Sequence, residues 1–434
     1  MNYYSTRNIH LTVPLRQAVL QGIAPDGGLY MPSTIPALPG AFFKNISQMS
    51  YSEIAYIISN TFFGQDVDSE IIKQIVTQSI NFDIPLVSVN NNHINVLELF
   101  HGPTLALNDL GARFMARLIH YFNPPNTPLN ILVATSGDAG SAVAAGFHDI
   151  PGVHVFILYP SSKVSDIQEA QFTTLGRNIT AIEIYGSFDD CQAMVTRASL
   201  DKDLTAKMAL TSANSVNIAR LLPQTIFFFL GYARMVENGA NPDEIVISLP
   251  CGNLGTLTAA IIARRMGLPV KRLIAVNNTN GFFYNYLKTG STTPVTTGAS
   301  LTSAIDVARP SNIDRIINLY RGDRNAIARD ITAVTVDDNR VINTINSVDS
   351  QYNYILEPHS AAAYAALCDN IADNESGLVL AVAHPAKFRN TVETAINRPL
   401  SIPDNVKDML SHPRHRKRMQ ANFSLLKEYL LNHS

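Results

Sequence analysis

Short apolar runs rich in β-branched residues alternate with helical stretches along most of the chain. One set of runs is NILVAT (130–135), VHVFILY (153–159) and AIEIY (181–185), and a later set is EIVISLP (244–250), RLIAV (272–276) and GLVLAVA (377–383). Helices are predicted over 188–200, 217–236 and 256–266. Near-continuous apolar strands that alternate with helices are typical of parallel sheets covered on both faces. The pattern therefore predicts an α/β protein with two doubly wound domains.

The first part of the chain lacks this alternation of apolar runs and helices. A loop with Gly27, Gly28 and several prolines precedes two predicted helices, over 51–63 and 68–80. We expect an N-terminal, partly helical module over 1–95, a first α/β domain over 96–240 and a second over 241–434. The last of these ends in a helical tail. Its basic stretch at 412–418 is interpreted as a solvated helical end rather than a nucleic-acid patch.

Composition and charge exclude several classes of protein. The 33 basic and 35 acidic residues nearly cancel, so neither nucleic acid nor an anionic membrane is an expected partner. No apolar stretch approaches the roughly 20 residues of a membrane helix, and the first residues lack the pattern of a secretory signal. Three widely spaced cysteines predict neither a disulfide framework nor a zinc site. We therefore expect a cytoplasmic protein.

Two glycine-containing junctions between a strand and a helix are candidate anion sites. One runs from Ser136 through Gly137 and Asp138, and the other from Gly252 through Asn253 and Leu254 to Gly255. Backbone N–H groups at a helix N-terminus favour an anion, and glycine allows its close approach. Doubly wound folds also place glycine at such turns for structural reasons, so each loop alone decides little.

Four further segments carry more polar groups than packing requires. They are ELFHGPTLALNDLGARF (98–114), SANSVNIAR (212–220), EPHS (357–360) and HPAKF (384–388). Within them Arg220 and Lys387 could bind an anionic ligand, and surface exposure is an equally good interpretation of each cation alone.

Taken together and in order, these segments resemble threonine synthase over nearly the whole chain. The matching stretches are APDGGLYMP (24–32), ELFHGPT (98–104), ATSGDAG (134–140), SANSVNIAR (212–220), GNLG (252–255), EPHSAAAY (357–364) and AHPAKF (383–388). The resemblance implies a pyridoxal-phosphate protein of fold type II, with the cofactor between the two α/β domains. It also implies the conversion of O-phospho-L-homoserine and water to L-threonine and phosphate, a step of threonine biosynthesis.

The resemblance also assigns roles to residues. The loop Gly252, Asn253, Leu254 and Gly255 would bind the cofactor phosphate. Ser136, Gly137 and Asp138 would lie at the carboxylate of the substrate. The substrate phosphate would meet four candidates, which are Ser212, Asn214, Arg220 and Lys387.

The chain departs from this family at the cofactor. The family has a lysine, which holds the cofactor as an imine, where this chain has Asn108, and an amide is not a nucleophilic amine. Val382 replaces the small polar residue that faces the pyridine nitrogen, and Ala139 replaces a threonine. Cys251, beside the phosphate loop, is interpreted as a packing substitution.

Three functions fit a scaffold with an altered cofactor site. The protein makes threonine at a much reduced rate, or it is an inactive ligand-binding or regulatory paralogue, for which a protein partner is an expectation. Alternatively, it performs a changed reaction on a related phospho-amino acid. Loss of one acid–base group alone costs roughly 10²–10⁴ in rate, so we predict impaired threonine synthase activity.

Overall fold

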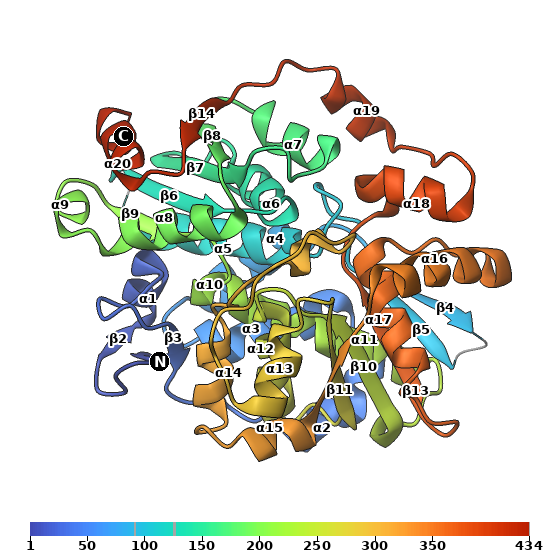
Figure 1. Ribbon diagram of the computed structural model, residues 1–434. Coiled ribbons are helices and arrows are strands. Elements are labelled where there is room, and N and C mark those ends of the chain that lie inside the picture. The colour runs from blue at the N-terminus through green and yellow to red at the C-terminus, as the bar shows by residue number, and fades with distance from the viewer. Residues whose placement is uncertain (91–92, 125–126, 434) are drawn as a thin grey trace.

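The apolar run that begins at residue 129 becomes an inner strand of a five-stranded, all-parallel sheet. The computed structural model describes residues 1–90, 93–124 and 127–433 (Figure 1). The sheet order is β14-β8-β7-β6-β9. Its strands are β6 (Leu129–Ala134), β7 (Val153–Pro160), β8 (Ile179–Tyr185), β9 (Leu210–Ser212) and β14 (Lys417–Gln420).

The later set of apolar runs forms a six-stranded sheet. Its order is β12-β11-β10-β13-β5-β4, in which only β4 is antiparallel to its neighbour among the described residues. The strands are β4 (Leu86–Asn90), β5 (Ile94–Glu98), β10 (Ile245–Pro250), β11 (Arg272–Asn277), β12 (Ile331–Thr335) and β13 (Ser376–Ala381). One fully parallel and one mostly parallel sheet confirm the predicted α/β architecture.

Helices cover the faces of both sheets, as parallel strands require. The helices between β5 and β10 in the chain are α5 (Asn108–Phe122), α6 (Asp138–Phe147), α7 (Asp166–Thr173), α8 (Phe188–Leu200), α9 (Lys202–Thr205), α10 (Ile218–Leu221) and α11 (Thr225–Glu237). The later helices are α12 (Gly255–Arg265), α13 (Phe282–Thr289), α14 (Ile313–Leu319), α15 (Arg324–Asp330), α16 (Asp338–Tyr352), α17 (Pro358–Cys368), α18 (Arg389–Ile396), α19 (Asp404–Leu410) and α20 (Phe423–Asn432). Short 3₁₀ turns occur at η2 (Leu222–Gln224), η3 (Pro242–Glu244), η4 (Ser303–Ile305) and η5 (Pro385–Phe388).

The N-terminal module combines a small antiparallel sheet with helices. The sheet order is β2-β1-β3, from β1 (Asn2–Ser5), β2 (Thr12–Pro14) and β3 (Tyr30–Pro32). The helical elements are α1 (Leu15–Gln21), α2 (Gly40–Asn45), η1 (Ile46–Gln48), α3 (Tyr51–Phe63) and α4 (Ser69–Ser79). The predicted helices over 51–63 and 68–80 are confirmed as α3 and α4. A Ser50–Glu53 capping box starts α3, and the Asp68 carboxylate caps α4.

One long predicted helix is wrong. Residues 217–236 form two helices, α10 and α11, separated by the 3₁₀ turn η2. Pro223 lies in that turn, and proline lacks the backbone N–H that an uninterrupted helix needs at an interior position.

Sheet membership differs from the expected division at 95 and 240. Strands β4 and β5 come early in the chain but belong to the sheet of β10 and β13. Strand β14, near the C-terminus, belongs to the sheet of β6 to β9. In Figure 1 the red C-terminal segment accordingly lies beside the green and teal strands of the first sheet. Each sheet is therefore completed by a distant part of the chain.

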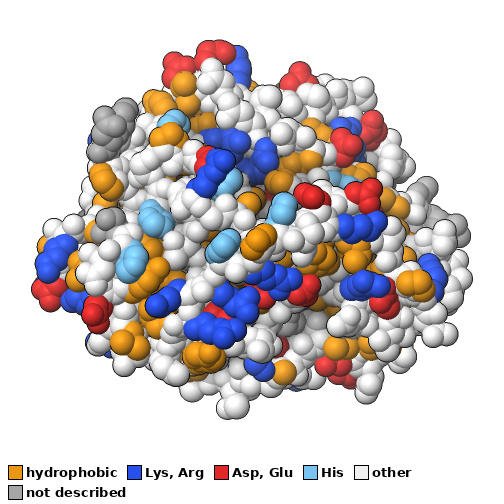
Figure 2. Space-filling view, turned by 90° about the horizontal axis from the view of Figure 1, so that it is seen from above, with side chains coloured by type: hydrophobic (Ala, Val, Ile, Leu, Met, Phe, Trp, Pro, Cys, Tyr) orange, Lys and Arg blue, Asp and Glu red, His pale blue; other side chains and the backbone are white. Residues whose placement is uncertain are grey.

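The basic stretch at 412–418 is not a helical end, which corrects that prediction. Helices α19 and α20 flank it, but residues 417–420 form β14 in parallel pairing with β8. The carboxylates of Asp166, Glu169 and Glu183 pair with the guanidinium groups of this stretch. Basic and acidic side chains are accordingly interspersed on the face seen in Figure 2. In the part of the chain that the structure describes, no helix is long and apolar enough to cross a membrane.

Candidate functional site

A cavity lies where the loops that follow β6 and β10 face each other, at the carboxyl ends of strands from both sheets. This is where open α/β sheets place ligands. The lining residues are Leu107, Asn108, Ala134, Ser136, Asp138, Ala139, Phe188, Asn214, Ser215, Arg220, Gln224, Pro250, Cys251, Gly252, Asn253, Leu254, Gly255, Thr256, Leu257, Ala304, Ile305, Val307, His359 and Val382.

Most candidate site residues from the sequence meet at this cavity. Those in the lining are Asn108, Ser136, Asp138, Asn214, Arg220, Gly252, Asn253, Leu254, Gly255 and Val382. Gly137, Ser212 and Lys387 are not among the lining residues. The geometry brings the candidates together, and the roles assigned to them stay predictions.

The loop after β10 has the form of an anion cradle. Leu254 has a left-handed φ of 57°, and helix α12 begins directly after it with no side-chain cap. Its first backbone N–H groups are therefore left to face an anion, as is common at helix N-termini. Gly252 is required by space, because a Cβ there would lie 2.3 Å from the carbonyl oxygen of Ala304.

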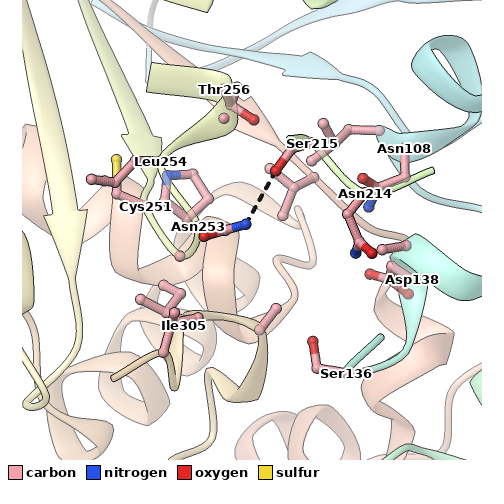
Figure 3. Close-up of a pocket in the computed structure, with 18 of the residues that line it drawn as sticks. Asn108, Ser136, Asp138, Asn214, Ser215, Cys251, Asn253, Leu254, Thr256 and Ile305 are labelled. Atoms are coloured by element: carbon pink, nitrogen blue, oxygen red, sulfur yellow. Dashed lines mark hydrogen bonds between the residues drawn. The ribbon is translucent and has the colours of Figure 1, made fainter. Parts of the chain in front are cut away.

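A polar network holds Asn253 at the edge of this cradle. The Asn253 Nδ2 donates to Ser215 Oγ at 3.2 Å, and the backbone N–H of Ser311 donates to Asn253 Oδ1 (Figure 3). Asn312 Nδ2 donates to both Ser215 Oγ and the Asn253 carbonyl, at 3.0 and 2.8 Å. The sequence motifs included Ser215 without singling it out, and no sequence signal pointed to Ser311 or Asn312.

The second glycine loop, after β6, positions Asp138 at the start of α6. Thr135 Oγ1 accepts from the backbone N–H groups of Gly137 and Gly140 and closes the turn. Asp138 Oδ1 lies 2.5 Å from Lys387 Nζ. Lys387 also donates to the carbonyl oxygen of Thr104 at 2.7 Å, and its side chain is fully buried. Lys387 thus supports Asp138 from behind and does not face the cavity.

The side chains of Ser212 and Asn214 form hydrogen bonds within the protein. Asn214 Oδ1 accepts from the N–H of Ala134 at 3.0 Å, and its Nδ2 donates to the carbonyl of Ala134 at 2.6 Å. Ser212 is fully buried and contacts Asn214 through its hydroxyl group. Asn214 fixes the end of β6, Ser212 holds Asn214, and both side chains have protein partners, so the structure offers no support for their predicted contact with a substrate phosphate.

Asn108 lies beside one buried cation, Arg220. Arg220 Nη2 donates to Asn108 Oδ1 at 3.0 Å, and Arg220 Nη1 donates to the carbonyl of Ala213 at 2.5 Å. Burial lowers the pKa of Arg220 to about 10, although nearby Asp109 acts in the opposite direction. Arg220 therefore stays a cation at neutral pH. The N–H of Leu107 donates to the carbonyl of Val382, which ties this segment to the end of β13.

Two lining residues with reactive side chains are committed to the protein. His359 Nδ1 lies 2.7 Å from Glu357 Oε2, and its Nε2 accepts from the backbone N–H of Ala304 at 3.1 Å. Burial raises the pKa of the Cys251 thiol to about 12, so it is protonated at neutral pH and is not a nucleophile. The sequence marks EPHS as a polar segment, but no residue type or spacing within it singles out His359 as a site residue.

Pyridoxal phosphate, which the resemblance implies, fits one end of the cavity. The cradle from Gly252 to Gly255 suits its phosphate, since the N-terminus of α12 points into the cavity there. The other end lacks the covalent partner: no lysine lines the cavity among the residues that the structure describes. Val382 has no side-chain group that can bind a pyridine nitrogen.

Comparisons with known proteins agree with this geometry. Models for the threonine synthase N terminus, for pyridoxal-phosphate dependent enzymes and for the threonine synthase C-terminal region match residues 2–80, 82–383 and 360–430. Threonine synthase from Escherichia coli is 37% identical over 433 residues, with 100% of both chains covered. Threonine synthase from Buchnera aphidicola (subsp. Acyrthosiphon pisum) is 38% identical and covers 99% of this chain and 100% of its own.

Solved structures give the same result. The crystal structure of the Escherichia coli threonine synthase superposes with a TM-score of 0.95 over 100% of both chains, at 37% identity. A threonine synthase from Brucella melitensis with bound pyridoxal phosphate gives 0.91 at 29% identity, over 100% of this chain and 99% of that one. With these matches along its whole length, the chain belongs to the threonine synthase family of fold-type II enzymes, whose cofactor is pyridoxal phosphate.

Proposed function

We propose that this chain binds pyridoxal phosphate and a phospho-amino acid such as O-phospho-L-homoserine, with no covalent bond between cofactor and protein. Threonine synthase turnover is therefore strongly impaired. One observation carries the proposal, namely a cavity in the described structure that no lysine lines. A lysine there would supply both a covalent anchor and a proton carrier, and one acid–base role alone is worth roughly 10²–10⁴ in rate.

The environment of Asn108 supports the same proposal. Its Oδ1 accepts a hydrogen bond from the buried Arg220, so the amide oxygen is already engaged by a cation. Lys387 is no substitute, because its Nζ is committed to Asp138 and to the carbonyl of Thr104. The phosphate cradle is present, but the lysine that would hold the cofactor and the polar group that would face its pyridine nitrogen are replaced by Asn108 and Val382. This combination favours binding over turnover.

The test compares the wild-type protein with Asn108→Lys. Both are purified, mixed with pyridoxal phosphate, and examined for the visible absorption of a protein-bound imine, then for a borohydride-trapped adduct located by mass spectrometry. Phosphate release from O-phospho-L-homoserine is measured on the same samples. We expect neither absorption nor adduct in the wild type. A trapped adduct on any lysine of the wild type, or ordinary turnover, would falsify the proposal.

For Asn108→Lys we expect an imine and a gain in phosphate release. The introduced amine would lie beside the Arg220 guanidinium, and a neighbouring cation together with burial lowers the pKa of an amine and makes it more nucleophilic. Asn108→Gln is the matched control, since it alters size without adding an amine. If Asn108→Lys forms the imine without releasing phosphate, the combined variant with Val382→Ser tests whether the second departure limits the reaction.

A further inference from the structure

The cavity is lined by few charged side chains. Among the described residues that line it, Asp138 has the one carboxylate and Arg220 the one guanidinium group, and there is no lysine. A phospho-amino acid carries one ammonium group and two kinds of anionic group. A buried ammonium needs an anionic partner, because leaving it unpaired costs several kcal/mol. In this lining only Asp138 can be that partner.

The rear of Asp138 is held by two buried donors. Lys387 Nζ lies 2.5 Å from Asp138 Oδ1, and Gln168 Nε2 donates to the same oxygen at 2.8 Å. Oδ2 receives no donor from the part of the chain that the structure describes. Figure 3 shows Asp138 and Ser136 on one side of the cavity, opposite Asn253 and Leu254. The carboxylate is thus oriented with one oxygen saturated and the other left for a ligand.

We infer that Asp138 binds the α-ammonium group of the phospho-amino acid through Oδ2. The inference rests on the proposed function and concerns the bound amino acid before its amine condenses with the cofactor aldehyde, when that amine is a charged ammonium. It also revises the role that the resemblance implied for Asp138, since a carboxylate repels the carboxylate of a ligand. The ligand carboxylate belongs instead at the backbone N–H groups of the α6 N-terminus, where the helix dipole favours an anion.

The test uses two ligands that differ only in the amine. Calorimetry at neutral pH compares O-phospho-L-homoserine with the butanoate analogue that keeps its carboxylate and phosphate but has no amino group. Pyridoxine phosphate is present at saturation, because it fills the cofactor site but has no aldehyde to condense with an amine. We expect the wild-type protein to bind the amino acid about 10- to 100-fold more tightly than the analogue, as for a charged hydrogen bond.

The Asp138→Asn variant should bring that affinity ratio close to one. Because this change leaves Lys387 buried without its carboxylate, the Asp138→Asn/Lys387→Met variant is the second choice if the single variant does not fold. Asp166→Asn, in an exposed carboxylate that pairs with Arg414, is the control and should keep the wild-type ratio.

The affinity ratio decides the inference, and the borohydride experiment decides the proposed function. An affinity ratio near one in the wild type, or a ratio that survives in Asp138→Asn, shows that Asp138 Oδ2 does not bind the ammonium group. An equal loss of both ligands in Asp138→Asn, with the ratio unchanged, assigns the residue a structural role only. A borohydride adduct on a lysine of the wild type contradicts the proposed function, whatever the ratio. If neither ligand binds the wild type, both are overturned.

Discussion

At the scale of single residues, Arg315 shows how a buried cation can organise a site that it does not line. Its guanidinium group is completely buried and donates to the carbonyl oxygens of Tyr30, Ser215 and Val216 and to Asn312 Oδ1. One side chain thereby joins the N-terminal module to the loop that anchors the phosphate cradle. The planar fork of arginine suits such a set of acceptors, which a lysine ammonium cannot reach together.

We therefore expect Arg315→Lys to lower the free energy of unfolding by about 2–4 kcal/mol, since buried carbonyl groups would lose their donors. Urea denaturation followed by circular dichroism measures the change. Arg309→Lys is the matched control, because Arg309 makes a partly exposed ion pair with Asp314 and its exchange should cost about 0.5 kcal/mol or less. Similar losses in the two variants would contradict the role given to Arg315.

At the scale of elements, helix α20 packs one apolar face against α8 and side chains of the first sheet. Leu426 and Leu430 are fully buried there, together with Phe423. The adjacent Leu425 is 43% exposed. Asn422 caps the helix by accepting from the N–H of Ser424. The helix is thus held by packing at successive turns, and two neighbouring leucines have opposite environments.

The pair offers an internally controlled prediction. Leu426→Ala should destabilise the protein by about 2–5 kcal/mol, because it opens a cavity in a packed cluster. Leu425→Ala, with the same chemical change one residue earlier, should cost less than about 1 kcal/mol. Thermal unfolding of both variants measures the difference. Equal effects would mean that α20 does not pack on the sheet through this face.

At the scale of the whole molecule, distant parts of the chain complete each sheet. The C-terminal segment returns to the first sheet as β14, where Glu183 accepts from Arg416 and Arg418 at 2.9 and 3.0 Å. Burial tends to raise the pKa of Glu183, but Ser161, Arg418 and Arg416 outweigh it and hold this pKa below its ordinary value. The ion pairs therefore fasten the end of the chain to strand β8.

We expect Glu183→Gln to release this segment more often, and limited proteolysis within 411–422 to be roughly tenfold faster, as for an opening free energy lowered by about 1.4 kcal/mol. A carboxyl whose folded pKa is depressed stabilises the protein above its ordinary pKa, and that stability is lost as the pH falls through the folded value. Wild-type cleavage should hence accelerate below about pH 4.5 and approach the rate of the variant. An acid-stable protease measures both. Glu393→Gln, in an exposed pair elsewhere, should leave the rate unchanged.

Much of the fold was predictable because buried parallel strands are apolar along their whole length. The runs that became β6, β7, β8, β10, β11 and β13 could be recognised for that reason. Strand β9 is too short and β14 too polar to produce this signal, and both depend on pairing with a neighbour already in place. Which sheet β4, β5 and β14 would join depends on long-range packing, which no local pattern encodes.

The same division holds for the site. The family, the two glycine loops and the replacement of lysine by Asn108 could be recognised from residue types alone, because these features depend on which residue stands at a given position. Only the tertiary structure decided which atoms reach the cavity. Lys387 turns to Asp138, Asn214 to the backbone of Ala134, and Arg220 to Asn108. Those orientations follow from burial and from partners far away in sequence, since a buried polar atom takes whichever partner the fold places within hydrogen-bonding distance.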